Sequence, residues 1–212
     1  MDIAFLLFDR ITALDAVGPY EVLSRLPNAE VRFVASEPGP KRTDTGSLVL
    51  FAEHSLGAMP HPDIIVVPGG PGTRSLLGDE AILEWIREAH RHSRWTTSVC
   101  TGALLLGAAG ILNGLRATTH WRALADLANY GAQPTKERVV EEGKVITAAG
   151  VSAGIDMALH LARIEAGDEF ARALQLVIEY DPQPPFDSGS RDRASDQVVE
   201  TALGVLGTRA TA

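Results

Sequence analysis

The chain of 212 residues contains a single cysteine, no run of basic residues and no apolar stretch long enough to span a bilayer. One thiol excludes an internal disulfide and any metal site built from several thiolates. Lys and Arg number 19 against 27 Asp and Glu, a net charge of −8, which makes nucleic acid and anionic membranes unfavourable partners. The apolar start of the chain has no basic region before it, so a soluble, cytoplasmic protein is expected.

Strand-like and helical patterns alternate along the chain, at a length that suits one large α/β domain. Strands are predicted at 3–8, 31–35, 45–52, 63–68, 96–99, 117–119, 138–140 and 144–147. Helices are predicted from about 15 to 26, from 79, at 101–109, through 124–127, at 152–166 and near 194–206. The segment 63–68 is apolar on both faces, as in a buried parallel strand. We therefore expect one domain over 1–212, with a mostly parallel sheet, a Pro-rich tail at about 180–190 and a C-terminal helix.

Cys100 stands in Ser98-Val-Cys-Thr-Gly102, where a strand pattern ends and a small apolar helix pattern begins. This layout is typical of a nucleophile elbow, which presents one strained side chain at the carboxyl end of a strand. The amides and dipole of the following helix favour the thiolate, so a lowered pKa is predicted for Cys100. A lone cysteine is more often a small core residue, but here a glycine-rich loop is expected at the same sheet edge, and we favour the reactive interpretation.

A cysteine enzyme needs a group near the sulfur that gives and takes protons. Asp15 follows the first predicted strand in Leu14-Asp-Ala-Val-Gly-Pro19, where apolar neighbours would raise its pKa and leave it a transferable proton. Capping of the following helix explains Asp15 equally well. His120 ends another strand and either lies at the pocket edge or hydrogen-bonds a carbonyl group, the second being slightly favoured.

The Gly-Gly-Pro-Gly sequence at 69–72 ends the most apolar strand. It lacks the lysine and the spacing of nucleotide-binding loops, so it is interpreted as a cradle for an anion or oxyanion. Gly69, Gly70 and His120 are accordingly the candidate substrate-binding residues.

The histidines show no pair spacing that suits a metal. His90 and His92 lie two apart on a predicted helix and face different sides of it. The remaining histidines are at 54, 61, 120 and 160. No metal and no other cofactor is expected.

Three motifs in combination carry a family resemblance. They are Ile64-Ile-Val-Val-Pro-Gly-Gly70, Ser98-Val-Cys-Thr-Gly102 and Arg116-Ala-Thr-Thr-His-Trp121. The chain resembles, over nearly its whole length, the class I glutamine amidotransferase-like superfamily, which includes the Parkinsonism-associated stress protein and the intracellular archaeal proteases. Within it, Leu14-Asp-Ala-Val-Gly-Pro19, the threonine after the cysteine and the tail Tyr180-Asp-Pro-Gln-Pro-Pro-Phe186 are most similar to the bacterial isocyanide hydratases.

This resemblance implies a flavodoxin-like three-layer sandwich and a homodimer whose active site lies close to the subunit interface. It also implies hydration of isocyanides to N-formamides without a cofactor. Cys100 would be the nucleophile, Asp15 the general acid and base, and Thr101 a neighbour that orients the reacting groups.

Departures from the superfamily pattern restrict the activity. Thr101 stands where the protease relatives have histidine, so their Cys-His pair is missing. No His-x-Glu pair follows the elbow, which removes the triad of glutamine amidotransferases, and Ser98 replaces the first elbow glycine. Neither proteolysis nor ammonia release from glutamine is expected.

Two other functions share these motifs. The amidotransferase-like ligand-sensing domain of AraC-type regulators also carries the Thr-Thr-His-Trp run, but only about one short helix follows the tail here, less than a helix-turn-helix region needs. A cysteine-based stress or redox protein is the other alternative, because an exposed cysteine of low pKa is easily oxidised.

Overall fold

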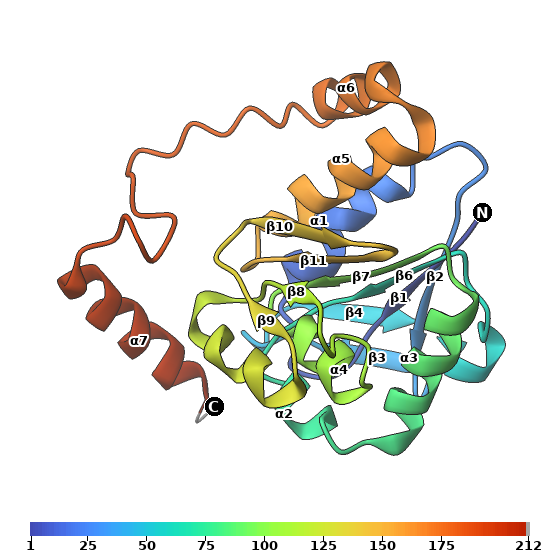
Figure 1. The fold of residues 1–212 in the computed structure, drawn as a ribbon, viewed down its shortest axis with the longest axis horizontal. Coiled ribbons are helices and arrows are strands. Elements are labelled where there is room, and N and C mark those ends of the chain that lie inside the picture. The colour runs from blue at the N-terminus through green and yellow to red at the C-terminus, as the bar shows by residue number, and fades with distance from the viewer. Residues whose placement is uncertain (211–212) are drawn as a thin grey trace. The chain divides into compact units, whose positions relative to one another are not determined.

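The computed structural model describes residues 1–210, with side chains described up to residue 207. The chain divides into two compact units, Met1–Ile178 and Glu179–Ala212. The first unit holds the sheet and six of the helices (Figure 1).

A seven-stranded sheet forms the centre of the first unit. Its order is β10-β11-β7-β6-β1-β2-β5, and all neighbours are parallel except the β10–β11 hairpin. The strands are β1 (Asp2–Leu6), β2 (Glu30–Ala35), β5 (His54–Ser55), β6 (Ile64–Val67), β7 (Trp95–Val99), β10 (Val139–Glu142) and β11 (Val145–Ala148). Strand β6 is fully buried, as its apolar sequence predicted.

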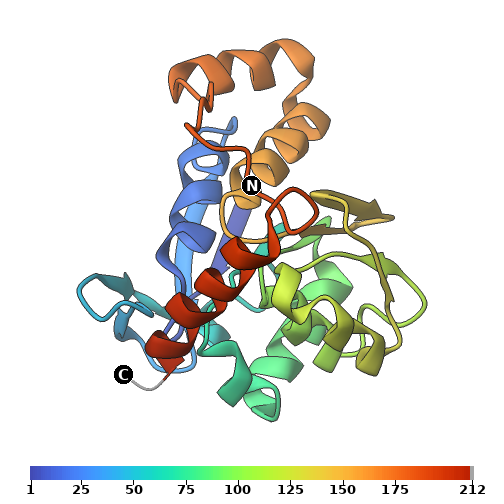
Figure 2. The same cartoon turned by 90° about the vertical axis from the view of Figure 1, so that its left-hand side faces the viewer.

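Helices cover both faces of this sheet. Helices α1 (Ala13–Leu23) and α5 (Ala153–Ala166) pack side by side on one face, and α6 (Asp168–Val177) packs on α5 (Figures 1 and 2). Helices α2 (Thr73–Leu76), α3 (Glu80–His92) and α4 (Gly102–Ala108) lie on the other face (Figure 1). The flavodoxin-like three-layer architecture expected from the sequence is therefore confirmed.

Helix α3 begins where the sequence predicted. Asp79 Oδ1 accepts hydrogen bonds from Ala81 N at 3.1 Å and Ile82 N at 3.3 Å, so the side chain satisfies two otherwise unpaired amides. The buried face of α3 includes Ile82, Trp85 and Ile86.

Several elements differ from the sequence prediction. Gly39–Arg42, where no strand was predicted, is strand β3, which pairs with β4 (Val49–Ala52) in a separate antiparallel hairpin. Pro40 fits there because an edge strand tolerates the missing amide hydrogen. Helix α6 was not predicted, and the helical pattern around 124–127 forms short 3-10 turns at Trp121–Ala123 and Ala125–Tyr130. β8 (Arg116–Ala117) pairs with β9 (Gln133–Pro134), and a 3-10 turn spans Leu56–Ala58.

Up to residue 210, the second unit contains one helix, α7 (Asp196–Ala210), which starts two residues later than predicted. No helix or strand occurs between 181 and 190, in agreement with the proline-rich sequence. Phe186 is 77% exposed. Among the described residues, no helix is long and apolar enough to cross a membrane.

Candidate active site

Cys100 occupies the turn between β7 and α4, at the carboxyl end of a central strand. Its backbone has a φ of 56°, a left-handed conformation that is strained for a residue with a side chain. The amide of Cys100 donates to Ala148 O at 3.1 Å and Ala149 O at 3.0 Å, which ties the turn to β11. The sequence prediction of an elbow at this residue agrees with the geometry, but the side chain is only 5% exposed.

Two further contacts hold the elbow in this conformation. The hydroxyl of Thr119 donates to Cys100 O at 2.6 Å inside the protein. Gly102 lies so close to β6 that a Cβ atom there would overlap the carbonyl oxygen of Val67. Only glycine permits helix α4 to begin this close to the sheet.

Asp15 lies in the first turn of α1 and is completely buried. Its Oδ2 accepts a hydrogen bond from Gly69 N at 2.9 Å, whereas its Oδ1 accepts none from the described residues. Loss of hydration, helped by the charge of Asp44, raises the pKa of Asp15 to about 7 against the opposing effects of the Gly69 amide and the Cys100 thiol. Asp15 therefore exchanges its proton near neutral pH.

Cys100 and Asp15 lie close enough for each side chain to act on the pKa of the other. Burial raises the pKa of the Cys100 thiol well above its usual value, and the charge of Asp15 raises it further, while the amides of Thr101 and Val151 lower it. The lowered pKa predicted from the helix dipole is therefore wrong. Desolvation of the nearly enclosed sulfur destabilises the thiolate more than the hydrogen bonds from the Thr101 and Val151 amides stabilise it.

The hydroxyl of Thr101 binds the glycine loop instead of the sulfur. It accepts from Gly70 N at 2.9 Å and from Thr73 Oγ1 at 3.1 Å, and it donates to Gly70 O at 3.1 Å. The backbone amide of Thr101 is the part that acts on Cys100. This residue thus links the glycine loop to the elbow.

Gly69 and Gly70 have amides that are already used inside the protein, by Asp15 and Thr101 respectively. A Cβ atom on Gly69 would lie 2.5 Å from Thr101 N and 2.9 Å from Asp15 Oδ2. Gly70 has a φ of 136°, which side chains rarely adopt. The loop therefore positions the Asp15 carboxyl group, and neither amide is free for an oxyanion in this conformation.

His120 is half-buried at the edge of the same region. Its ring packs on Gly150, where a Cβ atom would lie 2.7 Å from His120 Cδ2, and Gly150 precedes Val151, whose amide acts on the thiol. His120 Nδ1 accepts from Arg122 N at 3.4 Å, and burial and the charge of Arg122 lower its pKa. The neutral imidazole of His120 therefore contacts Gly150, the residue before Val151, whose amide acts on the Cys100 thiol.

Sequence reasoning missed two residues that shape the site, Thr119 and Val151. Thr119 is adjacent to His120 in a quoted motif, but nothing in the motif shows that its hydroxyl reaches Cys100 O. Val151, with a φ of 29°, precedes the predicted helix at 152 and gives no sequence signal.

Comparison with known proteins finds a matching family and similar proteins. Residues 1–164 match the DJ-1/PfpI family. The isonitrile hydratase of Pseudomonas putida is 46% identical over 202 residues, which is 95% of this chain and 88% of that protein. The HTH-type transcriptional regulator CdhR of Pseudomonas aeruginosa is 30% identical over 178 residues, which is 80% of this chain and 52% of the regulator.

A solved structure shares the fold in detail. The crystal structure of a THiJ/PfpI family protein from Pseudomonas syringae superimposes with a TM-score of 0.93 at 34% identity, covering 99% of this chain and 87% of that one. The superfamily resemblance stated from three sequence motifs is confirmed.

Proposed function

The chain belongs to the DJ-1/PfpI family, and on that premise we propose that it is a hydro-lyase that hydrates isocyanides to N-formamides. The observation that carries the proposal is the pair of Cys100 and Asp15, a buried thiol beside a buried carboxyl group with a pKa of about 7. The 46% identity to an isonitrile hydratase supports the same substrate class.

The first step joins the isocyanide to the protein. The terminal carbon of an isocyanide is weakly electrophilic, and it becomes basic once a nucleophile has added. Ionised Asp15 accepts the thiol proton as Cys100 Sγ forms a bond to this carbon, and Asp15 then delivers the proton to the same carbon. The product is a thioimidate, R–N=CH–S, on Cys100, and Asp15 is a carboxylate again.

The second step hydrolyses the thioimidate. Asp15 accepts a proton from water as the water oxygen attacks the thioimidate carbon, and the nitrogen is protonated through Asp15. The tetrahedral carbon then loses its bond to sulfur while the hydroxyl proton returns to Cys100. The N-formamide leaves, and the sum of both steps is addition of one water molecule.

The neighbouring residues have positioning and binding roles in this proposal. Gly69 N donates to Oδ2 of Asp15 through the cycle, which leaves Oδ1 to exchange protons with the sulfur and the substrate. The amides of Thr101 and Val151 oppose the cost of burying the sulfur as a thiolate. Gly69, Gly70 and His120 are proposed to border the substrate, with the glycines contributing shape more than free donors.

The proposal retains the single domain over 1–212, the homodimer and the cytoplasmic location expected from the sequence. Sedimentation velocity at several concentrations tests the dimer directly.

The test is hydration of p-nitrophenyl isocyanide, followed by absorbance with freshly reduced wild type and with Cys100→Ala. Wild type is expected to turn over, and Cys100→Ala is expected to lose turnover while keeping its circular dichroism spectrum. Mass spectrometry of acid-quenched protein should find an adduct equal to the whole isocyanide on Cys100. Equal turnover by Cys100→Ala, or none by wild type, would overturn the proposal.

A ligand-sensing role is the second candidate, because CdhR is 30% identical to this chain. It predicts saturable ligand binding without turnover in the same assay. The redox alternative loses support from the structure, since a thiol that is 5% exposed with a raised pKa is a poor target for oxidants.

A further inference from the structure

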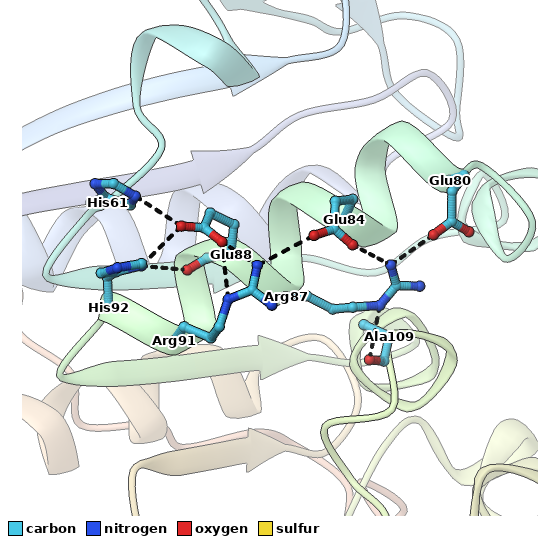
Figure 3. A network of polar contacts seen from close by, with 8 residues as sticks. All are labelled: His61, Glu80, Glu84, Arg87, Glu88, Arg91, His92 and Ala109. Atoms are coloured by element: carbon cyan, nitrogen blue, oxygen red, sulfur yellow. Dashed lines mark hydrogen bonds and ion pairs between the residues drawn. The ribbon is translucent and has the colours of Figure 1, made fainter.

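Three side chains of metal-binding type meet on the surface of the first unit, outside the Cys100 region. His61 comes from the segment before β6, whereas Glu88 and His92 come from the last two turns of α3 (Figure 3). His61 precedes β6 and His92 precedes β7, so the cluster lies near the amino ends of these parallel strands. Cys100 follows the carboxyl end of β7, and the cluster therefore lies near the opposite edge of the sheet.

The distances within this cluster suit one metal ion. His61 Nε2 lies 3.0 Å and His92 Nδ1 lies 3.3 Å from Glu88 Oε1. One ligand atom from each residue lies within 4.8 Å of the others. In a tetrahedral site with bonds of about 2.0 Å, ligand atoms are separated by about 3.3 Å. To close the three ligands around an ion, His92 Nδ1 must exchange its contact with the Glu88 carbonyl oxygen, 3.0 Å away, for the metal.

The surroundings restrict how these ligands move. Glu88 and His92 are four residues apart and share one face of α3. Arg91 binds Glu88 Oε2, with its Nε at 2.9 Å, and this leaves Oε1 directed at the two histidines (Figure 3). A ligand carboxylate whose other oxygen is held by a neighbour is typical of metal sites.

The donor set determines the class of metal. Two imidazoles and one carboxylate suit Zn²⁺, Cu²⁺ and Ni²⁺, whereas Mg²⁺ and Ca²⁺ prefer sites made of oxygen atoms alone. We infer that His61, Glu88 and His92 form a surface binding site for one such transition-metal ion, with water in the remaining position. The site is separate from the proposed chemistry at Cys100 and does not depend on it.

The experiment is calorimetric titration of tag-free protein with ZnCl₂. Wild type is expected to bind one ion per chain in a saturable manner. His61→Gln and His92→Gln should each weaken binding at least about tenfold, since even outer-shell partners of a metal site contribute that much. The matched control is His160→Gln, which removes a histidine paired with a single carboxylate, Glu141, and should leave binding unchanged.

A second measurement separates this site from the thiol. Cys100→Ala should bind Zn²⁺ as wild type does, and the spectrum of bound Cu²⁺ in electron paramagnetic resonance should show coupling to two nitrogen nuclei. Both His61 and His92 are exposed, so their variants are expected to keep the wild-type melting temperature. The inference is overturned by absence of saturable binding, by unchanged binding in both variants, or by loss of binding in Cys100→Ala.

Discussion

Asp15 keeps its proton to a pH at which ordinary carboxyl groups are fully ionised. It is completely buried, and the Gly69 amide and the Cys100 thiol replace only part of the hydration that its carboxylate would have in water. The same enclosure acts on Cys100, which prefers the neutral thiol. The two groups share a proton most effectively when the pair carries one proton in total.

This sharing predicts a particular dependence of kcat/KM on pH. Loss of the first proton from the pair activates the enzyme, so kcat/KM should rise with pH through an apparent pKa of about 7. Initial rates on p-nitrophenyl isocyanide between pH 5 and 9 measure it. Asp44→Asn should move this limb to lower pH, because the charge of Asp44 raises the pKa of Asp15. A rate independent of pH from 5 to 8 would contradict the assignment.

Burial of Asp15 also predicts how the free energy of unfolding depends on pH. The folded pKa of about 7 exceeds the unfolded value of 3.8, so the folded state holds the proton more tightly. Protonated Asp15 therefore stabilises the folded state. This stabilisation is complete below pH 3.8, is lost as the pH rises to 7, and is on the order of 4 kcal/mol in total. Asp15→Asn cannot titrate, so its stability relative to wild type should increase over this range. Urea unfolding of both proteins at several pH values measures the difference, and a constant difference would refute the raised pKa.

Sequence reasoning at this scale proposed Cys100 and Asp15 as a pair, because each follows an apolar strand at the edge where parallel sheets place ligands, and the structure brings the two side chains together. It gave the wrong direction for the pKa of Cys100, because exposure of a side chain is not visible in a local motif. It also overlooked the cluster of His61, Glu88 and His92, because His61 is distant from α3 in sequence and only the fold brings it there.

At the scale of elements, the position of α4 depends on a glycine at its start. Gly102→Ala should destabilise the protein by about 3 kcal/mol, because the new methyl group would overlap the carbonyl of Val67 in β6. Activity should fall as well, since Cys100 precedes this helix. Thermal unfolding and the isocyanide assay measure both effects.

The matched control for this substitution is Gly78→Ala. A Cβ atom at Gly78 has no neighbour within 4 Å, and the backbone there is not left-handed. Its stability should stay within about 0.5 kcal/mol of wild type. Equal stability of the Gly102 and Gly78 variants would show that α4 can shift away from β6 with no loss in the free energy of unfolding.

Elements were predictable where burial dictates the pattern, as in β6 and α3. They were less predictable at edges, where β3 carries Gly39 and Pro40 in spite of the turn-like sequence. Helix α6 was missed because Gly167 directly follows α5 and separates two helices with no loop between them. These are places where pairing and packing with distant segments decide the local structure.

At the scale of the whole molecule, the buried core ends before the second unit begins. The last buried hydrophobic residue is Leu174, and no residue from 179 to 207 is buried. A chain ending at Ile178 should therefore fold, with a cooperative melting transition close to that of the full chain. Circular dichroism during heating tests it. Loss of the transition would instead show that residues beyond 178 are needed for this fold.

The elbow encloses the only sulfhydryl group of the chain. A thiol reagent such as a disulfide dye reaches it only when the surrounding structure opens, so the labelling rate of the folded protein reports that opening. Dividing this rate by the rate of the unfolded chain gives the fraction of time for which the enclosure is open. Cys100 thus reports local opening of the native protein, with no label to engineer and no second cysteine to remove.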